Sequence, residues 1–213
     1  MHNTLDLAKL WKPDYAAPRK PALLDIGPAV YLAVEGKGEP GGADFSVRVG
    51  ALYAMAYTIK MTRKFDGRQD YTVSKLEAQW WGGEGEPCFA NLPKSEWRWR
   101  LMIRTPDFVA EKELEAARAA LQKRGKDAGT EDVRLFSFTE GPCVQMLHVG
   151  PYEREAETVE KMLAFAGTKG MAPHGPHHEI YISDPRRVPP ARLKTILRRP
   201  VKPASEAPPS GSY

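Results

Sequence analysis

The spacing of apolar residues changes along the chain, and each change predicts a different kind of element. Between residues 43 and 62 they recur every three or four positions, which is typical of a helix with one buried stripe. Elsewhere apolar and polar residues alternate, which is typical of strands. The expected helices cover residues 5–11, 43–62, 109–124 and 153–166. The expected strands cover 22–26, 29–35, 71–81, 97–104, 134–140, 143–149, 178–183 and 193–197, with turns at Gly27-Pro28 and Gly82 to Pro87.

The same order of elements occurs twice, and so do three short sequence segments. Residues 27–36 return as 141–150, residues 75–80 as 177–182, and residues 97–106 as 191–200. Such internal repetition indicates a duplicated unit, and the seam between two copies is a natural place for a ligand. We therefore expect an α+β fold in which two pseudo-symmetric β-α-β-β modules form one body around a central groove.

This plan divides the chain into five segments. They are an N-terminal helix and linker at 1–21, a first module at 22–106, a linker helix at 107–130, a second module at 131–202 and a disordered tail at 203–213.

Composition narrows the class of protein. A charged fraction of 27% and the absence of any apolar run of about 20 residues argue against a membrane protein. The N-terminus lacks a secretory layout, and Cys88 and Cys143 form no C-x-x-C pattern, so we expect a cytoplasmic monomer with free thiols. The net charge of +4 is mild, and neither a cofactor nor a nucleic-acid partner is expected.

Strand alternation predicts which side chains face the groove. In the first module Leu76, Ala78 and Trp80 should face the helix, because one face of a β-α-β-β sheet is covered by it. Glu77 and Trp81 should then lie on the open face. In the second module we expect Ile180 and Ile182 against the helix, with Glu179 and Tyr181 on the open face. Carboxylates among aromatic rings suit a planar or cationic organic ligand.

Three stretches resemble a known family. Residues 97–108, 145–152 and 177–187 are similar to GyrI-like small-molecule-binding proteins, and residues 6–13 and 193–200 also fit. The resemblance implies a duplicated SHS2-type fold, shared with the effector domains of multidrug-sensing regulators such as BmrR. Some stand-alone members are cyclopropanoid cyclopropyl hydrolases, which open the strained ring of DNA-alkylating compounds of the yatakemycin type; others are known only as binders. The family's buried acidic residue corresponds to Glu179.

These observations select candidate site residues. Glu179 is the candidate acid or base, and Tyr181 and Tyr152 are candidate donors to a developing oxyanion. The expected ligand-binding residues are Trp81, Trp99, Glu77, Tyr31, His148 and Tyr53.

Three other interpretations fit less well. A metal site at His174, His177, His178 and Glu179 is not expected, because adjacent strand residues point to opposite faces. Alternating basic residues at 98–104 and 192–198 are expected to be solvated rather than to bind nucleic acid, since the neighbouring rings face the other way. The glycine-rich segment 36–42 lacks the ending of a phosphate loop.

The sequence thus predicts a protein that binds aromatic small molecules and detoxifies cyclopropane-bearing alkylators by hydrolysis. A drug-sequestering or drug-sensing protein without catalysis remains an open alternative, as does a protein that interacts with DNA gyrase.

Overall fold

A computed structural model describes residues 4–83, 90 and 92–206. Its contacts divide the chain into two compact units. Unit 1 contains residues 1–13 and 28–138, and unit 2 contains residues 14–27 and 139–213. Two long strands, β1 (Ala22–Lys37) and β4 (Arg134–Val149), each have one end in unit 1 and the other end in unit 2. Two of the unit boundaries therefore fall within strands, and the third lies in the turn between Pro13 and Asp14.

Unit 1 contains most of the first β-α-β-β sequence. Its elements are α1 (Leu7–Leu10), the greater part of β1, α2 (Ala43–Phe65), β2 (Leu76–Trp81), η2 (Lys94–Glu96), β3 (Arg98–Thr105), α3 (Glu111–Gln122), η3 (Thr130–Asp132) and the start of β4. β3 pairs antiparallel with β1 on one side and with β2 on the other. The helix α1 begins after Asp6, whose carboxylate accepts from the backbone of Lys9, and not after Thr4.

An aromatic cluster joins the unit 1 sheet to α2. Phe45 of α2 stacks on Trp80 with ring centroids 5.9 Å apart and meets Trp99 edge-on at 5.2 Å. Trp80 and Trp99 are directly paired across β2 and β3, so they share one face of the sheet. Gly36 pairs with Trp99 from β1, and its lack of a side chain makes room for the indole. The sequence correctly predicted that Trp80 faces the helix.

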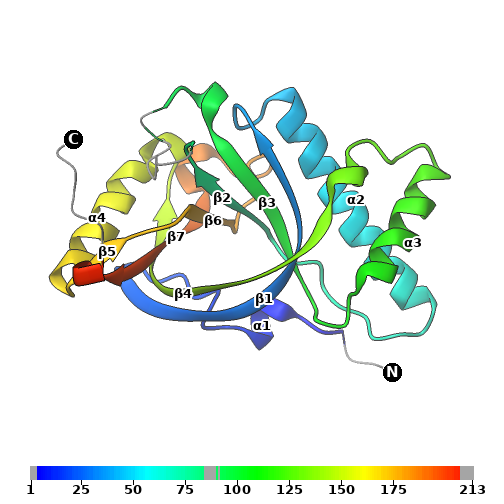
Figure 1. The fold of residues 1–213 in the computed structure, drawn as a ribbon, viewed down its shortest axis with the longest axis horizontal. Helices are drawn as coiled ribbons and strands as arrows, with labels where there is room; N and C mark the ends of the chain where they lie inside the picture. Colours follow the sequence, from blue (N-terminus) through cyan, green and yellow to red (C-terminus); the bar gives the residue numbers. More distant parts are fainter. Residues whose placement is uncertain (1–3, 84–89, 91, 207–213) are drawn as a thin grey trace. The chain divides into compact units, whose positions relative to one another are not determined.

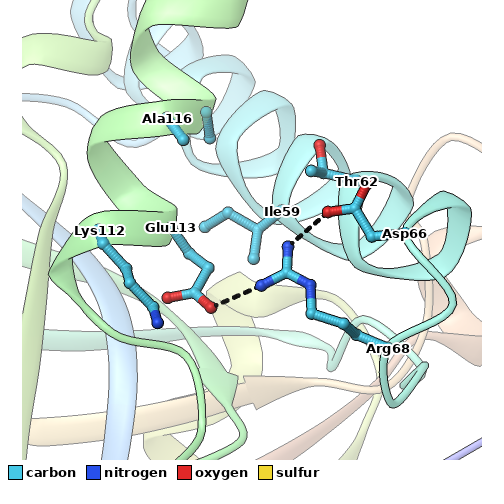
Figure 2. A pocket seen from close by; sticks show the side chains of 8 residues that line it. Ile59, Thr62, Asp66, Arg68, Lys112, Glu113 and Ala116 are labelled. Carbon is cyan, nitrogen blue, oxygen red and sulfur yellow. Dashed lines mark hydrogen bonds and ion pairs between the residues drawn. The ribbon is translucent and has the colours of Figure 1, made fainter.

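Charged side chains connect α2 to α3, which lie side by side (Figure 1). Glu113 of α3 accepts from Arg63 at 3.0 Å and from Arg68 at 3.1 Å. Arg68 also donates to Asp66, as Figure 2 shows. Because Arg63 and Glu113 are both buried, this group fixes the packing of the two helices.

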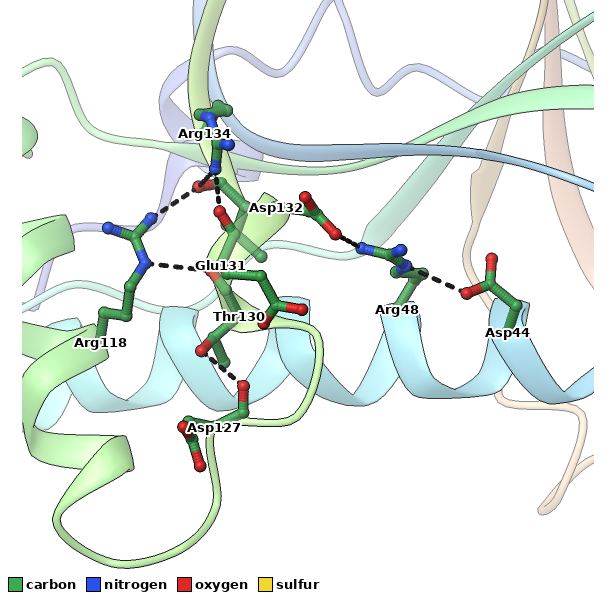
Figure 3. Close-up of polar contacts among 9 residues, drawn as sticks. Asp44, Arg48, Arg118, Asp127, Thr130, Glu131, Asp132 and Arg134 are labelled. Atoms are coloured by element: carbon green, nitrogen blue, oxygen red, sulfur yellow. Dashed lines mark hydrogen bonds and ion pairs between the residues drawn. The ribbon is translucent and has the colours of Figure 1, made fainter.

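A second set of polar contacts holds the segment that leads into β4 (Figure 3). Arg48 of α2 bonds to Asp44 and Asp132, and Arg118 of α3 donates to the carbonyls of Thr130 and Val133. Both helices thereby determine where β4 begins.

Unit 2 repeats the plan. It contains the rest of β1 and β4, followed by η4 (Tyr152–Arg154), α4 (Glu155–Thr168), β5 (Met171–Pro173), β6 (His177–Tyr181), η5 (Pro190–Arg192), β7 (Lys194–Pro203) and η6 (Ala204–Glu206). β7 pairs antiparallel with β4, β6 and β5. Met162 and Ala166 of α4 pack on Val144, Leu197 and Val201, so α4 covers one face of these strands.

Polar side chains occupy the other face of unit 2. Arg198 donates to Glu140 at 2.7 Å and to Gln145 at 2.6 Å, and Nδ1 of His178 lies 2.9 Å from Glu140. Arg198 and Gln145 also bond to backbone carbonyls of the N-terminal segment, at Asp14 and Ala16. Burial alone would raise the pKa of Glu140, but His178 and Arg198 outweigh it and lower this pKa to about 2.

The expected turns at the repeated Gly-Pro pairs were wrong, because β1 and β4 each continue through the pair as one strand. Gly141 has a positive φ of 71°, a backbone conformation that glycine adopts readily, whereas Gly27 has no such positive φ. Proline has no backbone N–H to donate to a neighbouring strand, and it is tolerated at irregular positions of a strand.

Other boundaries also differ from the expectations. Tyr71 makes only an isolated bridge to Leu5, so β2 is shorter than expected, while β7 continues six residues beyond the expected Leu197, to Pro203. β5 was not foreseen. The tail was expected to be disordered from residue 203, but β7 reaches Pro203 and η6 covers Ala204–Glu206, so this part of the expectation was wrong. The expected loop from 82 to 87, Cys88 and the tail from 207 onward lie largely or wholly outside the described residues.

The α+β class and the repeated β-α-β-β order are confirmed. Over residues 4–83, 90 and 92–206, no helix has the length and apolar character that crossing a membrane requires.

Candidate functional site

Two buried glutamates from different elements meet in unit 2. Glu155 is the first residue of α4, and Glu179 lies in β6. Glu179 pairs with Leu197, whose side chain packs under α4, so its carboxylate points toward that helix. Carboxylate oxygens of both residues and a ring nitrogen of His177 lie within 4.8 Å of one another. We call these three residues the acid cluster.

Neighbouring side chains hold Glu179 from both sides. The hydroxyl of Tyr181 donates to its Oε2 at 2.7 Å, and Nε2 of His177 lies 3.3 Å from its Oε1. Tyr152 packs edge-on against Tyr181, with ring centroids 6.0 Å apart. Tyr152 is the exposed member of this group, whereas the three residues of the acid cluster are buried.

Electrostatics make Glu155 unusual. Burial and the nearby charge of Glu179 raise the pKa of Glu155 to about 10, although it stands at a helix N-terminus, where a carboxylate is normally stabilised. Its Oε1 is buried without a hydrogen-bond partner among the described residues. At neutral pH the pair therefore contains one carboxylic acid. Burial, followed by the charges of Glu155 and Glu179, also raises the pKa of Tyr152 to about 12.

The structure brings together the three predicted catalytic residues, Glu179, Tyr181 and Tyr152, but on a different face from the one expected. In the repeated segments, Met102 of the first copy corresponds to Ile196 of the second. Met102 pairs with Glu77 across the strands, whereas Ile196 pairs with Ile180. Glu77 thus corresponds to Ile180 and not to Glu179. A shift of one residue moves every side chain of a strand to the other face. The expectation that Glu179 and Tyr181 lie on the open face was wrong.

Glu155 was missed by the sequence analysis. A glutamate in the first turn of a helix is common because it complements the helix dipole, so its position alone gave no functional signal. Only the closeness of α4 to β6 distinguishes it from Glu153, Glu157 and Glu160, which are exposed.

Three of the predicted ligand-binding residues share a face in unit 1. Tyr31, Glu77 and Trp81 lie on the face of the sheet away from α2, because their strand partners Arg104, Met102 and Arg98 alternate with the residues that face the helix. Arg100 lies on this face as well, with its guanidinium 4.0 Å from the ring centroid of Phe136 and 5.6 Å from that of Trp81. Glu77 is only 1% exposed.

The other three lie elsewhere. Trp99 is buried under α2 beside Gly36, and Tyr53 stacks on Tyr57 within α2. His148 bonds through Nδ1 to Thr158 and through Nε2 to the carbonyl of Pro151, so a ligand would have to displace one of these bonds.

The histidine run separates as the strand pattern predicted. His177 points toward Glu179 within the acid cluster, while His178 points to the opposite face and contacts Glu140. The basic strand residues are less uniform than expected: Arg98 and Lys194 are exposed, but Arg104 and Arg198 are buried, so these faces are not simply solvated.

Two shallow cavities occur in unit 1. One, of about 480 Å³, lies between α2 and α3 with Arg68, Lys112 and Glu113 in its wall (Figure 2). The other, of about 310 Å³, lies beside α1 and includes Trp11 and Arg104. Both are lined by charges that already pair or stack within unit 1.

Comparisons with known proteins place this geometry in context. The family model for the GyrI-like small molecule binding domain matches residues 101–202. The structure is similar to that of an uncharacterized conserved protein from Listeria innocua, with 42% identity and a TM-score of 0.87, covering 93% of this chain and 100% of that one. It is also similar to a hydrolase from Listeria innocua, with 40% identity and a TM-score of 0.84, covering 93% and 100% of the two chains.

A more distant similarity links the chain to the C-terminal domain of EcmrR, at 12% identity and a TM-score of 0.54, covering 86% of this chain and 98% of that one. At this identity the likeness concerns the fold alone. Among curated proteins, no sequence matches the chain. The family model and the two Listeria proteins, which align with nearly the whole sequence, agree: the chain belongs to the GyrI-like family of small-molecule-binding proteins.

Proposed function

We propose that this protein is a hydrolase of aromatic small molecules, and that Glu155 and Glu179 form its acid–base pair. The observation that carries the proposal is that two buried carboxyl groups, one from α4 and one from β6, have oxygen atoms within 4.8 Å of each other. A pair of carboxyl groups of which one is protonated supplies a general acid and a general base together. The similar protein from Listeria innocua described as a hydrolase supports this class of activity.

The roles follow from the contacts. Glu155, whose pKa is raised to about 10, is the proton donor at neutral pH. Glu179 is the base, because its neighbour Glu155 holds the proton of the pair and the hydroxyl of Tyr181 orients the Glu179 carboxylate by donating to its Oε2. The hydroxyl of Tyr152 makes no hydrogen bond to other described residues, and we assign it to an oxygen of the ligand.

The proposed substrate class is a cyclopropane conjugated to a carbonyl, as in DNA-alkylating toxins. Glu179 takes a proton from water while the water oxygen bonds to a ring carbon. The strained carbon–carbon bond breaks, its electron pair passes into the conjugated carbonyl, and the carbonyl oxygen takes the proton of Glu155. Direct exchange between the two neighbouring carboxyl groups returns the proton to Glu155. The net reaction adds one water, and ring strain supplies the driving force.

The test is turnover of excess cyclopropanoid compound, followed by the loss of the conjugated chromophore and by a product mass one water heavier. We expect Glu179→Gln and Glu155→Gln each to lower kcat by roughly 10²- to 10⁴-fold. Glu160→Gln, an exposed glutamate on the same helix, should leave kcat unchanged. The rate should fall as the pH approaches about 10, where Glu155 ionises. Consumption of one equivalent or none would exclude this activity for that substrate.

Binding without chemistry is the second candidate, and the unit 1 face favours it. Tyr31, Glu77 and Trp81 combine aromatic rings with a carboxylate, a lining suited to a planar cation. Equilibrium dialysis with a planar cationic dye tests this function. Saturable binding that Glu77→Gln weakens, with no hydrolysis of any cyclopropanoid compound, would favour the binder over the enzyme.

A further inference from the structure

Glu155, His177 and Glu179 resemble a set of metal ligands as well as an acid–base pair. From the sequence no metal site was expected at His174, His177, His178 and Glu179, because neighbouring residues of this run point to two faces of a strand. In the structure, only His177 and Glu179 of this run belong to the cluster, and the third candidate ligand is Glu155, from the start of α4. We propose that the acid cluster is a binding site for one divalent first-row transition-metal ion, with Zn²⁺ as the reference ion.

The separations within the cluster fit a common ion. Two atoms that each lie about 2.1 Å from a tetrahedral Zn²⁺ are about 3.4 Å apart. Nε2 of His177 and Oε1 of Glu179 are 3.3 Å apart, and the ligand atoms of all three residues lie within 4.8 Å of one another. The three ligand atoms are therefore close enough together for a single ion to bind among them.

The contacts of the two glutamates orient one oxygen of each for coordination. The hydroxyl of Tyr181 bonds to Oε2 of Glu179 and so directs Oε1 toward His177. Oε1 of Glu155 is buried with no hydrogen-bond partner in the part of the chain that the structure describes. A buried oxygen that lacks a partner is costly, and a bound cation satisfies it.

The ligand types determine the class of ion. One imidazole nitrogen with two carboxylate oxygens suits Zn²⁺, Mn²⁺, Fe²⁺ or Co²⁺, whereas Ca²⁺ and Mg²⁺ prefer oxygen ligands alone. Three protein ligands leave a fourth position of a tetrahedral ion open.

Metal binding has a consequence that rests on the proposed hydrolase function. An ion coordinated by both glutamates occupies the carboxylate oxygens that the proposed reaction uses for proton transfer, so metal and reaction compete for the same atoms. Zn²⁺ should therefore inhibit the hydrolysis while stabilising the fold.

The first experiment uses the unmodified full chain. Titration with Co²⁺ at neutral pH should produce the visible absorption band of a four-coordinate ion at one ion per chain, and Zn²⁺ should displace it. The same ions should raise the unfolding temperature. Failure to develop the band, together with loss of all Zn²⁺ on dialysis, would overturn the proposal.

Variants then locate the site. His177→Gln and Glu155→Gln should each weaken Zn²⁺ binding by about 100-fold or more, and Tyr181→Phe, which touches only a ligand, by about 10-fold. His174→Gln, a histidine outside the cluster, should bind as the wild type does. Equal binding by His177→Gln and wild type would place the ion elsewhere and refute the site.

The hydrolysis assay separates the two proposals. Absence of metal binding with normal hydrolysis removes only the metal site. Tight binding that leaves hydrolysis unchanged supports the metal site and removes the acid pair from the reaction.

Discussion

Unit 1 and unit 2 are built from the same β-α-β-β order, yet they place their acidic residues on opposite faces of the sheet. Glu77 of β2 faces away from α2, on the side of Tyr31 and Met102. Glu179 of β6 faces α4 and meets Glu155. The cause is a difference of one residue in strand register, which exchanges the two faces completely.

The comparison shows that similar sequence segments do not guarantee equivalent sites. In unit 1 the side of the sheet under the helix is an aromatic core of Phe45, Trp80 and Trp99. In unit 2 the corresponding side has an apolar part near Met162 and an acidic part near Glu155. The duplicated fold therefore supports packing in one unit and candidate chemistry in the other.

The largest expected effect tests the polar face of unit 2. Arg198→Met leaves Glu140 buried without the guanidinium that pairs with it, and we expect a loss of about 3–5 kcal/mol in the free energy of unfolding. Arg100→Met in unit 1 should cost less, about 1–3 kcal/mol, because its carboxylate partner Glu35 is exposed and can be hydrated, and only the neutral Oε1 of buried Gln79 loses its donor. Urea unfolding of both variants gives the comparison. Equal losses would show that burial does not distinguish the two arginines.

The next effect concerns the acid pair. The folded-state pKa of Glu155, about 10, is above its unfolded value of about 4.3, so the wild type loses stability as pH rises between these values. Glu155→Gln lacks this loss and should gain, relative to wild type, up to about 3 kcal/mol in the free energy of unfolding between pH 6 and pH 8. Thermal or urea unfolding across this range measures it, with Glu160→Gln as the control. Parallel pH profiles for wild type and Glu155→Gln would contradict the raised pKa.

The smallest effect tests the aromatic core of unit 1. A Cβ at Gly36 would lie 2.1 Å from a ring carbon of Trp99, so Gly36→Ala should cost about 1–3 kcal/mol through overpacking. Gly50→Ala on the exposed side of α2 meets nothing within 4 Å and should be neutral or stabilising by up to about 1 kcal/mol. Tryptophan fluorescence during urea unfolding measures the stability of both variants. A tolerated Gly36→Ala would mean that the indole moves freely.

Much of the fold was accessible from the pattern of the sequence. The helix at 43–65 was predicted because three- and four-residue spacing persists over several turns, and the helix at 111–122 because its residues have high helix propensity. The helix at 155–168 was predicted as the counterpart of the first in the repeated order. The strands at 98–105 and 177–181 were predicted from alternation. The continuous course of β1 and β4 through their Gly-Pro pairs was not, because the same residues also fit a turn, and only pairing with neighbouring strands decides between the two.

The candidate site was accessible only in part. Glu179, Tyr181 and Tyr152 were named from the strand pattern and the family resemblance, and the structure brings them together. Trp99 was expected at a ligand and is a core residue, since alternation alone does not say which face a helix covers. Glu155 was absent from the expectation because nothing local separates it from its exposed neighbours.

The sequence by itself determined the α+β class, the repeated element order and the family, because these depend on local periodicity and on motifs that are contiguous along the chain. The tertiary structure decided the strand register, the face on which each carboxylate lies and the meeting of Glu155 with Glu179. These features arise from pairing between segments that are distant in sequence, and a single residue of register, which costs nothing in local pattern, reverses them.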